Sequence, residues 1–371
     1  MRILFTGGGT GGHVYPLIAV IRETRKLYPK KDLEFFYIGP EDEFGSILLS
    51  QEDVIVKTIS SGKIRRYFSF QNIIDALFKI PLGIIQSFFY IIKIKPQIVF
   101  SKGGSGSILV TFCAKIFRIP IFIHESDIIP GLSNKMTSKW ARKIFISFPK
   151  TEYFDLDKTI LVGNPVRSEI LNGNKEKAIE MFNLTLQKPV IFFSGGSQGA
   201  EFINDFVLRI LNSLLQEFEV IHLCGPNNLK QVQAEAQAII NKDLEPYYHP
   251  YAFLDEEKLK NAYRAADFII SRAGSGSIFE IAAIGIPSIL VPLPSAAGNH
   301  QARNAYSYAE TGAALVMEQD NLTENFFLEK LHYLLMHQKK LDKMKEEALR
   351  FSKPYAAKTI ARTILEYLML E

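Results

Sequence analysis

A histidine, His13, follows a cluster of glycines near the start of the chain, within the stretch TGGGTGGHVYP at 6–16. Gly7, Gly9 and Gly12 match the spacing G-x-G-x-x-G, which brings a backbone close to a dinucleotide. Imidazole is the side chain whose ordinary pKa suits it to take a proton near neutral pH. The stretch therefore has two interpretations: a cofactor-binding loop, or a phosphate loop that carries a catalytic base.

Three further glycine-rich segments share this pattern, each directly after a short apolar run. They are SKGGSGS at 101–107, SGGSQGA at 194–200 and SRAGSGS at 271–277. Glycine lets a backbone approach a ligand closely, and a helix that follows such a loop offers N–H groups to an anion. Two loops in each half of the chain indicate two similar domains whose edges suit a nucleoside diphosphate. No Gly-Lys-Ser/Thr motif is present, so phosphoryl transfer by a P-loop is not predicted.

Apolar runs alternate with helix-period segments along the chain, which is typical of buried parallel strands in a doubly wound α/β fold. The turn-forming residues at 162–165 are the predicted linker, so we expect a first domain over 1–163 and a second over 164–353. Strands are expected at 3–5, 33–38, 98–100, 121–123, 144–147, 190–193, 220–223, 268–270 and 288–291, with helices that include 16–27 and 201–215.

The composition fits a globular protein of two domains, with 371 residues of which 47% are hydrophobic and 22% are charged. The net charge of +4 is too small to predict nucleic-acid binding. Cys113 and Cys224 lie far apart in apolar contexts, which favours buried free thiols over a disulfide or a metal site. The first residues are interpreted as a strand and not as a signal peptide.

A nicotinamide-dependent oxidoreductase is the minor alternative. It needs an acidic residue at the end of the second strand to bind the ribose. The strand expected at 33–38 ends at the Gly39-Pro40 turn, and only Glu41 or Asp42 follows it. Five glycines among the six positions from 7 to 12 also produce the dinucleotide spacing readily, so the match is poor.

Seven longer motifs carry a resemblance to one known family, the MurG family of bacterial glycosyltransferases. These enzymes transfer N-acetylglucosamine from UDP-N-acetylglucosamine (UDP-GlcNAc) to the undecaprenyl-linked muramoyl-pentapeptide lipid I. The resemblance covers nearly the whole chain and implies a GT-B fold, with two Rossmann-like domains that face each other across a cleft. It also implies that a helix over about 354–371 returns to the first, acceptor-binding domain. The motifs lie at 8–16, 62–69, 124–135, 163–167, 195–200, 271–292 and 299–305.

The resemblance places the donor in the second domain, with Glu280 at the ribose hydroxyls. A carboxylate suits a vicinal diol because it can accept two hydrogen bonds. Asp127 stands where some members have asparagine, and an ionised aspartate cannot donate, which leaves its contact with the sugar open. The backbone of Leu254 is implied to contact the uracil, and His300 and Gln301 the sugar. The implied diphosphate contacts are Arg167, Ser197, Ser275, Gly276 and Ser277. Thr10, Gly11 and Gly12 are further implied donor contacts.

We infer that His13 is the general base that takes the proton of the acceptor's C4 hydroxyl, with Gly103, Gly104 and Ser105 as a phosphate loop on the acceptor side. A helix N-terminus next to the ring helps to keep it uncharged. We expect no metal ion and no cofactor, because His124 and Glu125 have no partners at the spacing of metal ligands. Helix termini and Arg167 are the expected stabilisers of the leaving group.

A lipid acceptor predicts contact with a membrane. The apolar stretch at 73–92 is interrupted by Asp75, Lys79 and Pro81, which argues against a transmembrane helix. Basic residues at 63–66, 93 and 95 flank it, which favours peripheral binding to anionic lipid at the cytoplasmic face of the plasma membrane. A buried helix with solvated flanks is the alternative. For function, a transferase with another acceptor and a nucleotide-sugar-binding protein also stay open.

Overall fold

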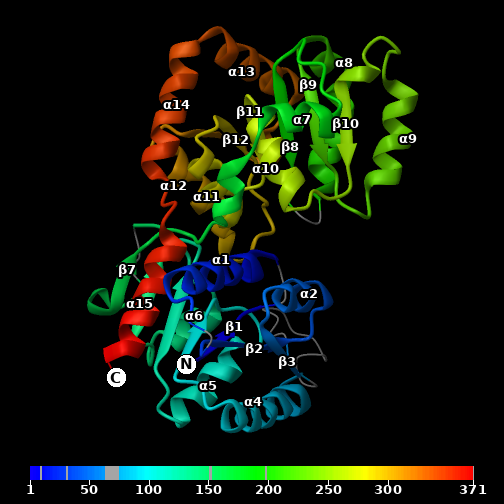
Figure 1. Ribbon diagram of the computed structural model, residues 1–371. Coiled ribbons are helices and arrows are strands. Elements are labelled where there is room, and N and C mark those ends of the chain that lie inside the picture. Colours follow the sequence, from blue (N-terminus) through cyan, green and yellow to red (C-terminus); the bar gives the residue numbers. More distant parts are fainter. Residues whose placement is uncertain (9–10, 31, 63–74, 150–152, 197–198, 371) are drawn as a thin grey trace. The chain divides into compact units, whose positions relative to one another are not determined.

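The computed structural model describes residues 1–8, 11–30, 32–62, 75–149, 153–196 and 199–370. The chain forms two compact units, shown with their elements in Figure 1. The first unit comprises residues 1–167 and 353–371, and the second comprises 168–352. The boundary expected from the sequence lay at 163, so Arg167 belongs to the first unit and not to the second.

The first unit contains a seven-stranded parallel sheet with the order β3-β2-β1-β4-β5-β6-β7. Its central strands are buried along their whole length because helices cover both faces. The strands are β1 (Arg2–Thr6), β2 (Glu34–Pro40), β3 (Ile55–Ile59), β4 (Ile98–Ser101), β5 (Ile121–Glu125), β6 (Lys143–Ile146) and β7 (Thr159–Leu161).

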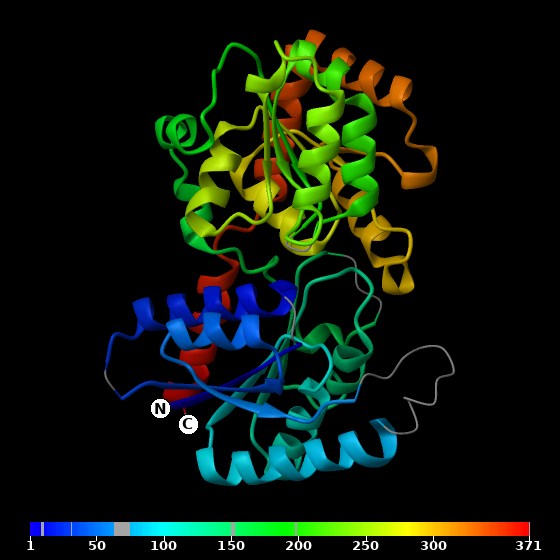
Figure 2. The ribbon, with the colours of Figure 1, turned by 90° about the vertical axis from the view of Figure 1, so that its right-hand side faces the viewer.

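Alternate residues of β1 face two separate cores of the first unit. Ile3 and Phe5 pack with α1 and the C-terminal helix α15, and Leu4 packs with α4 and α5 on the other face. Figure 2 shows α1 and α2 on one side of this sheet and α4 on the other. The helices are α1 (Gly11–Leu27), α2 (Glu43–Gln51), α4 (Ile80–Ile94), α5 (Ser107–Ile116), α6 (Leu132–Thr137) and α15 (Ala356–Leu370), and a π-helical turn (Asp75–Lys79) precedes α4.

The second unit repeats the arrangement with six parallel strands in the order β10-β9-β8-β11-β12-β13. Its main core lies between this sheet and α8, α9, α13 and α14. The strands are β8 (Val190–Ser194), β9 (Glu219–Leu223), β10 (Tyr248–Tyr251), β11 (Phe268–Ser271), β12 (Ser288–Leu290) and β13 (Ala314–Val316). The helices are α7 (Lys175–Phe182), α8 (Glu201–Glu217), α9 (Leu229–Ile239), α10 (Glu256–Ala265), α11 (Ser275–Ile284), α12 (His300–Ala309), α13 (Glu324–Met336) and α14 (Gln338–Phe351).

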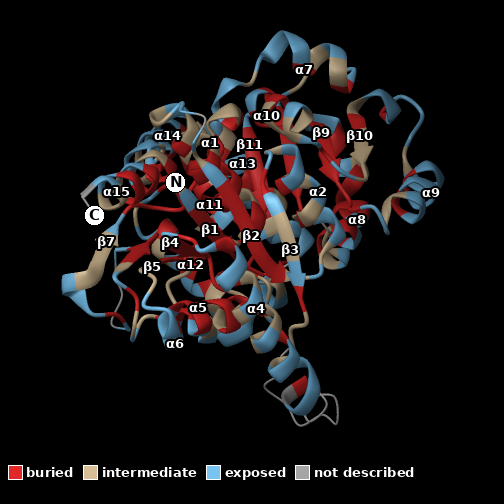
Figure 3. Cartoon of the chain, turned by 60° about the horizontal axis from the view of Figure 1, so that its bottom comes forward, coloured by how far each residue is buried: buried red, intermediate tan, exposed pale blue. Residues whose placement is uncertain are grey.

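Local sequence fixes several helix ends. Asp42, Asn174 and Asp255 each accept a hydrogen bond from the backbone N–H three residues later, which caps α2, α7 and α10. Gly285 ends α11 with φ of 76°, a left-handed conformation that glycine adopts without strain. Figure 3 shows the resulting pattern, with buried strands and helices whose outer faces are exposed. Cys113 and Cys224 are both buried and free, which confirms that prediction.

Candidate active site

The four glycine loops follow β1, β4, β8 and β11, the two central strands of each sheet. In each sheet the strand order reverses between these two strands. Ligands of open α/β sheets bind beyond the carboxyl ends of the strands at such a reversal, because the loops there diverge to opposite faces. The topology therefore brings the paired loops of each unit to the position where that unit is expected to hold a ligand.

His13 lies in the first turn of α1, against both glycine loops of the first unit. A Cβ on Gly8 would lie 3.0 Å from His13 Nδ1, and a Cβ on Gly104 would lie 3.0 Å from His13 Nε2. Gly104 has φ of 91°, which favours glycine there. Burial, and then the charge of Lys102, lower the pKa of His13 to about 3, so the ring is uncharged at neutral pH.

A buried lysine, Lys102, lies at the end of β4 beside this histidine. Its backbone N–H donates to Thr6 O at 2.9 Å, and its ammonium donates to Ser126 Oγ at 2.8 Å. Burial lowers the pKa of Lys102, and the carboxylates of Glu125 and Asp127 oppose that effect. The first unit thus holds a charged cluster that includes a residue of its second glycine loop.

Glu125, the last residue of β5, organises the loop that carries Asp127. Its Oε1 accepts from Asp127 N at 3.1 Å, and its Oε2 accepts from Gly131 N at 3.0 Å and from Asn134 Nδ2 at 3.0 Å. Burial, together with the charge of Asp127, raises the pKa of Glu125 to about 6. These hydrogen bonds hold Asp127 near the Lys102 ammonium.

Arg167 and the linker attach to the same part of the first unit. The Arg167 guanidinium carbon lies 4.0 Å from the centre of the Tyr15 ring, two residues beyond His13 on α1. His124 Nε2 donates to Gly163 O at 2.9 Å, which anchors the end of the linker. Gly11 and Gly12 form the start of α1, and Gly103 to Ser105 form the loop before α5. Thr10 lies outside the described residues.

In the second unit, the predicted diphosphate contacts lie at the start of α11. Ser275, Gly276 and Ser277 form its first turn, with Gly274 as the N-cap. A Cβ on Gly276 would meet no heavy atom within 4 Å, so the N-terminal turn is open on that side. This turn therefore offers backbone N–H groups to an anion. Ser197 lies outside the described residues.

Glu280 lies one turn further along α11 and is oriented by a tyrosine. Tyr263 Oη donates to Glu280 Oε2 at 3.0 Å. Tyr263 is 4% exposed and its ring packs against Phe192. A carboxylate has acceptor capacity for several hydrogen bonds, so this arrangement allows further donors such as ribose hydroxyls.

The other predicted donor contacts lie in one loop and at the start of α12. Leu254 is buried, in the loop that joins β10 to α10. Gln301 Oε1 accepts from Leu293 N at 3.0 Å, so its amide NH2 is the group that can reach a ligand. His300 Nδ1 donates to Ala297 O at 2.8 Å, so Nε2 is the ring nitrogen that can reach a ligand.

Family models, relatives and a solved structure all match this chain over most of its length. The glycosyltransferase family 28 N-terminal domain matches residues 3–146, and the family 28 C-terminal domain matches 190–360. The chain is 37% identical over 341 residues to the UDP-N-acetylglucosamine–N-acetylmuramyl-(pentapeptide) pyrophosphoryl-undecaprenol N-acetylglucosamine transferase of Clostridium tetani, covering 91% of each chain. It is 37% identical over 352 residues to the protein of the same name from Clostridium kluyveri, covering 94% of this chain and 96% of that one. The crystal structure of Acinetobacter baumannii MurG matches with a TM-score of 0.75 and 25% identity, over 98% of this chain and 99% of that one.

The chain belongs to the MurG family.

It is a glycosyltransferase with the GT-B fold, and membership of the MurG family confirms both predictions. The oxidoreductase alternative fails, and the structure agrees: Asp42, offered above as a ribose contact, accepts from Gly45 N at 2.8 Å and caps α2 instead. In the part of the chain that the structure describes, no three His, Cys, Asp or Glu side chains are grouped to hold a metal ion.

Sequence reasoning missed a basic residue in each unit of this MurG-family chain. Lys102 and Arg272 occupy equivalent positions, directly after β4 and β11. Arg272 is also buried, and its Nη1 donates to Val291 O at 3.2 Å, directly after β12. In the same way, Lys102 donates to Ser126, directly after β5. The repeated pattern Ser-basic-x-Gly-Ser-Gly-Ser was the signal that could have identified them.

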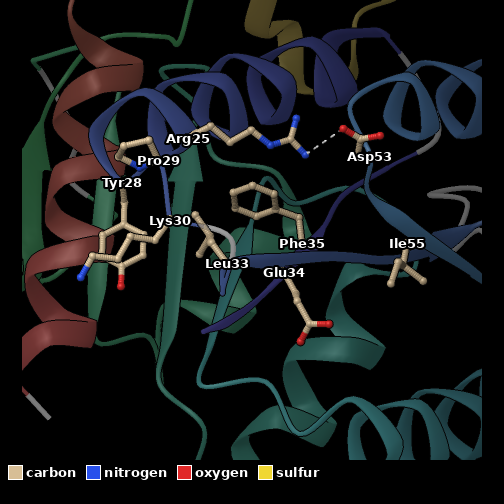
Figure 4. Close-up of a pocket in the computed structure, with 9 residues that line it drawn as sticks. All are labelled: Arg25, Tyr28, Pro29, Lys30, Leu33, Glu34, Phe35, Asp53 and Ile55. Carbon is tan, nitrogen blue, oxygen red and sulfur yellow. Dashed lines mark ion pairs between the residues drawn. The ribbon is translucent and has the colours of Figure 1, made fainter.

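A separate cavity in the first unit, drawn in Figure 4, lies at the amino ends of the strands. It borders the starting residues of β2 and β3, and the ion pair between Arg25 and Asp53 at 3.8 Å crosses it. The glycine loops follow the carboxyl ends of the strands, so this cavity is not part of the candidate site. Its lining residues are Arg25, Tyr28, Pro29, Lys30, Leu33, Glu34, Phe35, Asp53 and Ile55.

Proposed function

We propose that this enzyme transfers N-acetylglucosamine from UDP-GlcNAc to the C4 hydroxyl of the muramoyl unit of lipid I, giving lipid II for peptidoglycan synthesis. The names of the relatives from Clostridium tetani and Clostridium kluyveri support these substrates. The observation that carries the proposal is the uncharged His13 ring between the two glycine loops of the first unit.

In the proposed reaction the acceptor's C4 oxygen attacks the anomeric carbon of the donor sugar. The bond from that carbon to the UDP oxygen breaks as the new β1→4 bond forms, and configuration is inverted. His13 takes the hydroxyl proton as the bond forms, since an alcohol is too weak an acid to ionise first. The loop at 103–105 binds the acceptor diphosphate through backbone N–H groups, and Gly11 and Gly12 contact the donor.

The second unit holds the UDP part of the donor in this proposal. Glu280 accepts the ribose hydroxyls, and the first turn of α11 binds the diphosphate. Backbone groups at Leu254 contact the uracil, while His300 and Gln301 contact the sugar. UDP leaves with its negative charge stabilised by the helix N-terminus and by Arg167, without a step that needs a metal ion.

We also propose that the first unit docks on anionic membrane through α4. By length and composition the window Leu77–Ile94 could cross a bilayer, and 22% of it is buried. The helix has two faces, however. Gly83, Ser87 and Ile91 are buried against the unit, which supports peripheral contact over spanning. The opposite face exposes Leu82, Ile85, Phe89 and Ile92.

Positive charge beside the apolar face supports an anionic lipid as the partner. Lys93 and Lys95 are exposed at the end of α4, and Lys115 and Arg118 are exposed on and just after α5. Lys79, just before α4, pairs with Asp75 at 2.9 Å. Basic residues beside an apolar face strengthen binding to acidic headgroups. The basic cluster predicted at 63–66 lies outside the described residues. The location at the cytoplasmic face of the plasma membrane follows from the proposed substrates.

Product analysis tests the proposed transfer. The enzyme is incubated with UDP-GlcNAc and a lipid I analogue, and the lipid product is examined by mass spectrometry and NMR. We expect one added N-acetylhexosamine, joined β1→4 to the muramoyl residue. Unchanged lipid with tightly bound UDP-GlcNAc would instead identify a nucleotide-sugar-binding protein. Transfer to other acceptors alone would identify a related transferase.

A further inference from the structure

The ammonium group of Lys102 is buried close to His13. Lys102 is 2% exposed, and in the described part of the chain its ammonium donates one hydrogen bond, to Ser126 Oγ at 2.8 Å. An ammonium carries three N–H donors, and a buried charge is retained only where its surroundings stabilise it. A lysine in this position therefore needs an explanation beyond packing.

The backbone geometry sets this lysine beside the proposed base. A Cβ on Gly7 would lie 3.5 Å from His13 Cβ and 3.6 Å from Lys102 Cβ, so both side chains begin next to Gly7. Tyr37 Oη donates to Gly7 O at 3.1 Å and fixes this part of the loop.

The titratable groups around Lys102 come from β5, from the loop that follows β5 and from α1. Glu125 and Asp127 favour its charge, whereas the charge of Lys102 disfavours a proton on His13 of α1 and on His124 of β5. Glu125 accepts backbone hydrogen bonds of its own loop, and Ser126 Oγ accepts directly from the ammonium at 2.8 Å.

We propose that Lys102 is a positioning residue for His13: its buried ammonium, held by Ser126, disfavours a second positive charge beside it, so the imidazole meets the acceptor hydroxyl in its uncharged form. This inference rests on the proposed role of His13 as the base. During transfer the proton passes from the C4 oxygen to the ring. The nearby positive charge then favours its release to water, which returns the ring to its starting form.

Histidine NMR of the full-length protein, without substrates, tests the link between the two residues. His13 is assigned with His13→Gln, and the ring signals are followed from pH 8 to pH 4.5. We expect the His13 ring to stay uncharged over this range in the unaltered protein. Lys102→Met removes the charge at nearly constant length, and the pKa of His13 should then shift upward.

Three further variants make the test specific. Lys102→Gln removes the charge but keeps a donor for Ser126, so it should give the same upward shift if Lys102→Met does not fold. Lys102→Arg keeps the charge and should leave the pKa of His13 low. Lys26→Met removes an exposed charge from the far end of α1, the helix that carries His13, and should leave the pKa of His13 unchanged. An unchanged His13 pKa in both uncharged variants would overturn the proposal.

The pH dependence of kcat/KM separates this inference from the proposed function. If His13 is the base, the acid limb of the profile should move to higher pH in Lys102→Met together with the NMR titration. A shifted titration with an unmoved acid limb supports the action of Lys102 on His13 and contradicts the role of His13 as the base.

Discussion

The imidazole of His13 lies against the backbone of Gly104: a Cβ on Gly104 would stand 3.0 Å from His13 Nε2 and 2.7 Å from Gly8 N. This contact joins the loop after β1 to the loop after β4, at the reversal of the strand order. The proposed base is therefore in contact with the proposed phosphate loop.

Gly104→Ala tests that contact. The φ of 91° is unfavourable for alanine, and the new methyl group would meet the Gly8 backbone. We expect a strain of about 1–2 kcal/mol from the backbone alone, with a lower Tm and a raised KM for the acceptor. Gly131→Ala is the matched control, because its φ is –62° and a Cβ there meets no heavy atom within 4 Å. Equal behaviour of the two variants would show that the loops are not packed as described.

Glu280→Ala tests the donor site. Loss of a charge-assisted hydrogen bond to the ribose should cost roughly 1.5–3 kcal/mol and raise the donor KM about tenfold or more. Tyr263→Phe removes only the hydroxyl that orients Glu280, so a smaller rise is expected. Calorimetry with UDP gives the affinities directly. Unchanged UDP affinity in a folded Glu280→Ala protein would rule out this donor site.

Membrane binding should depend on the exposed face of α4. Phe89 is 64% exposed, and Phe89→Ser should weaken co-sedimentation with vesicles that contain acidic lipid. Binding should also fall as salt rises, because the attraction of the lysines is screened. The control is Phe326→Ser, which removes an exposed phenylalanine of α13 in the other unit. Equal vesicle binding by both variants would exclude α4 as the docking surface.

Stability should fall in mild acid because of His222. This ring is fully buried between Tyr248 Oη at 2.8 Å and Asn204 Oδ1 at 3.1 Å, and burial lowers its pKa to about 3. Between that value and the ordinary 6.5 the unfolded chain binds a proton that the folded chain does not, so stability decreases as pH falls.

The expected loss from His222 between pH 7.5 and pH 5 is about 2 kcal/mol in the free energy of unfolding. Urea unfolding of the unaltered protein and of His222→Gln measures it, and the variant should lose less stability over the same range. His332→Gln, at an exposed position, should keep the original dependence. A steeper dependence in His222→Gln would refute the assignment of a buried, uncharged ring.

The strands predicted from the sequence are those at the centre of each sheet. All nine expected runs form strands, whereas the four strands that were missed, β3, β7, β10 and β13, are the edge strands of the two sheets. An edge strand has one unpaired side and an exposed face, so it carries residues such as Lys57 and Pro250 instead of a continuous apolar run. The apolar signal that reveals a central strand is therefore absent at the edges.

The same reasoning applies to the candidate site. The glycine loops were predicted because their residue types and spacing are visible in the chain, and Glu280 was predicted through the resemblance to the MurG family. The role of Lys102 was not, since a lysine after a strand is most often exposed. Its burial depends on Ser126 and Glu125, which the parallel order of β4 and β5 brings close to it. Register and strand order decide such contacts, and one short motif predicts neither of them.

The release of UDP from UDP-GlcNAc, with and without a lipid I analogue, tests the central claim most directly. We predict release that depends on the analogue, and a kcat lower by on the order of 10²–10⁴-fold in His13→Ala while UDP affinity stays close to that of the unaltered enzyme. UDP release that does not depend on the analogue would contradict the account. So would a folded His13→Ala enzyme that keeps the original kcat at saturating substrates.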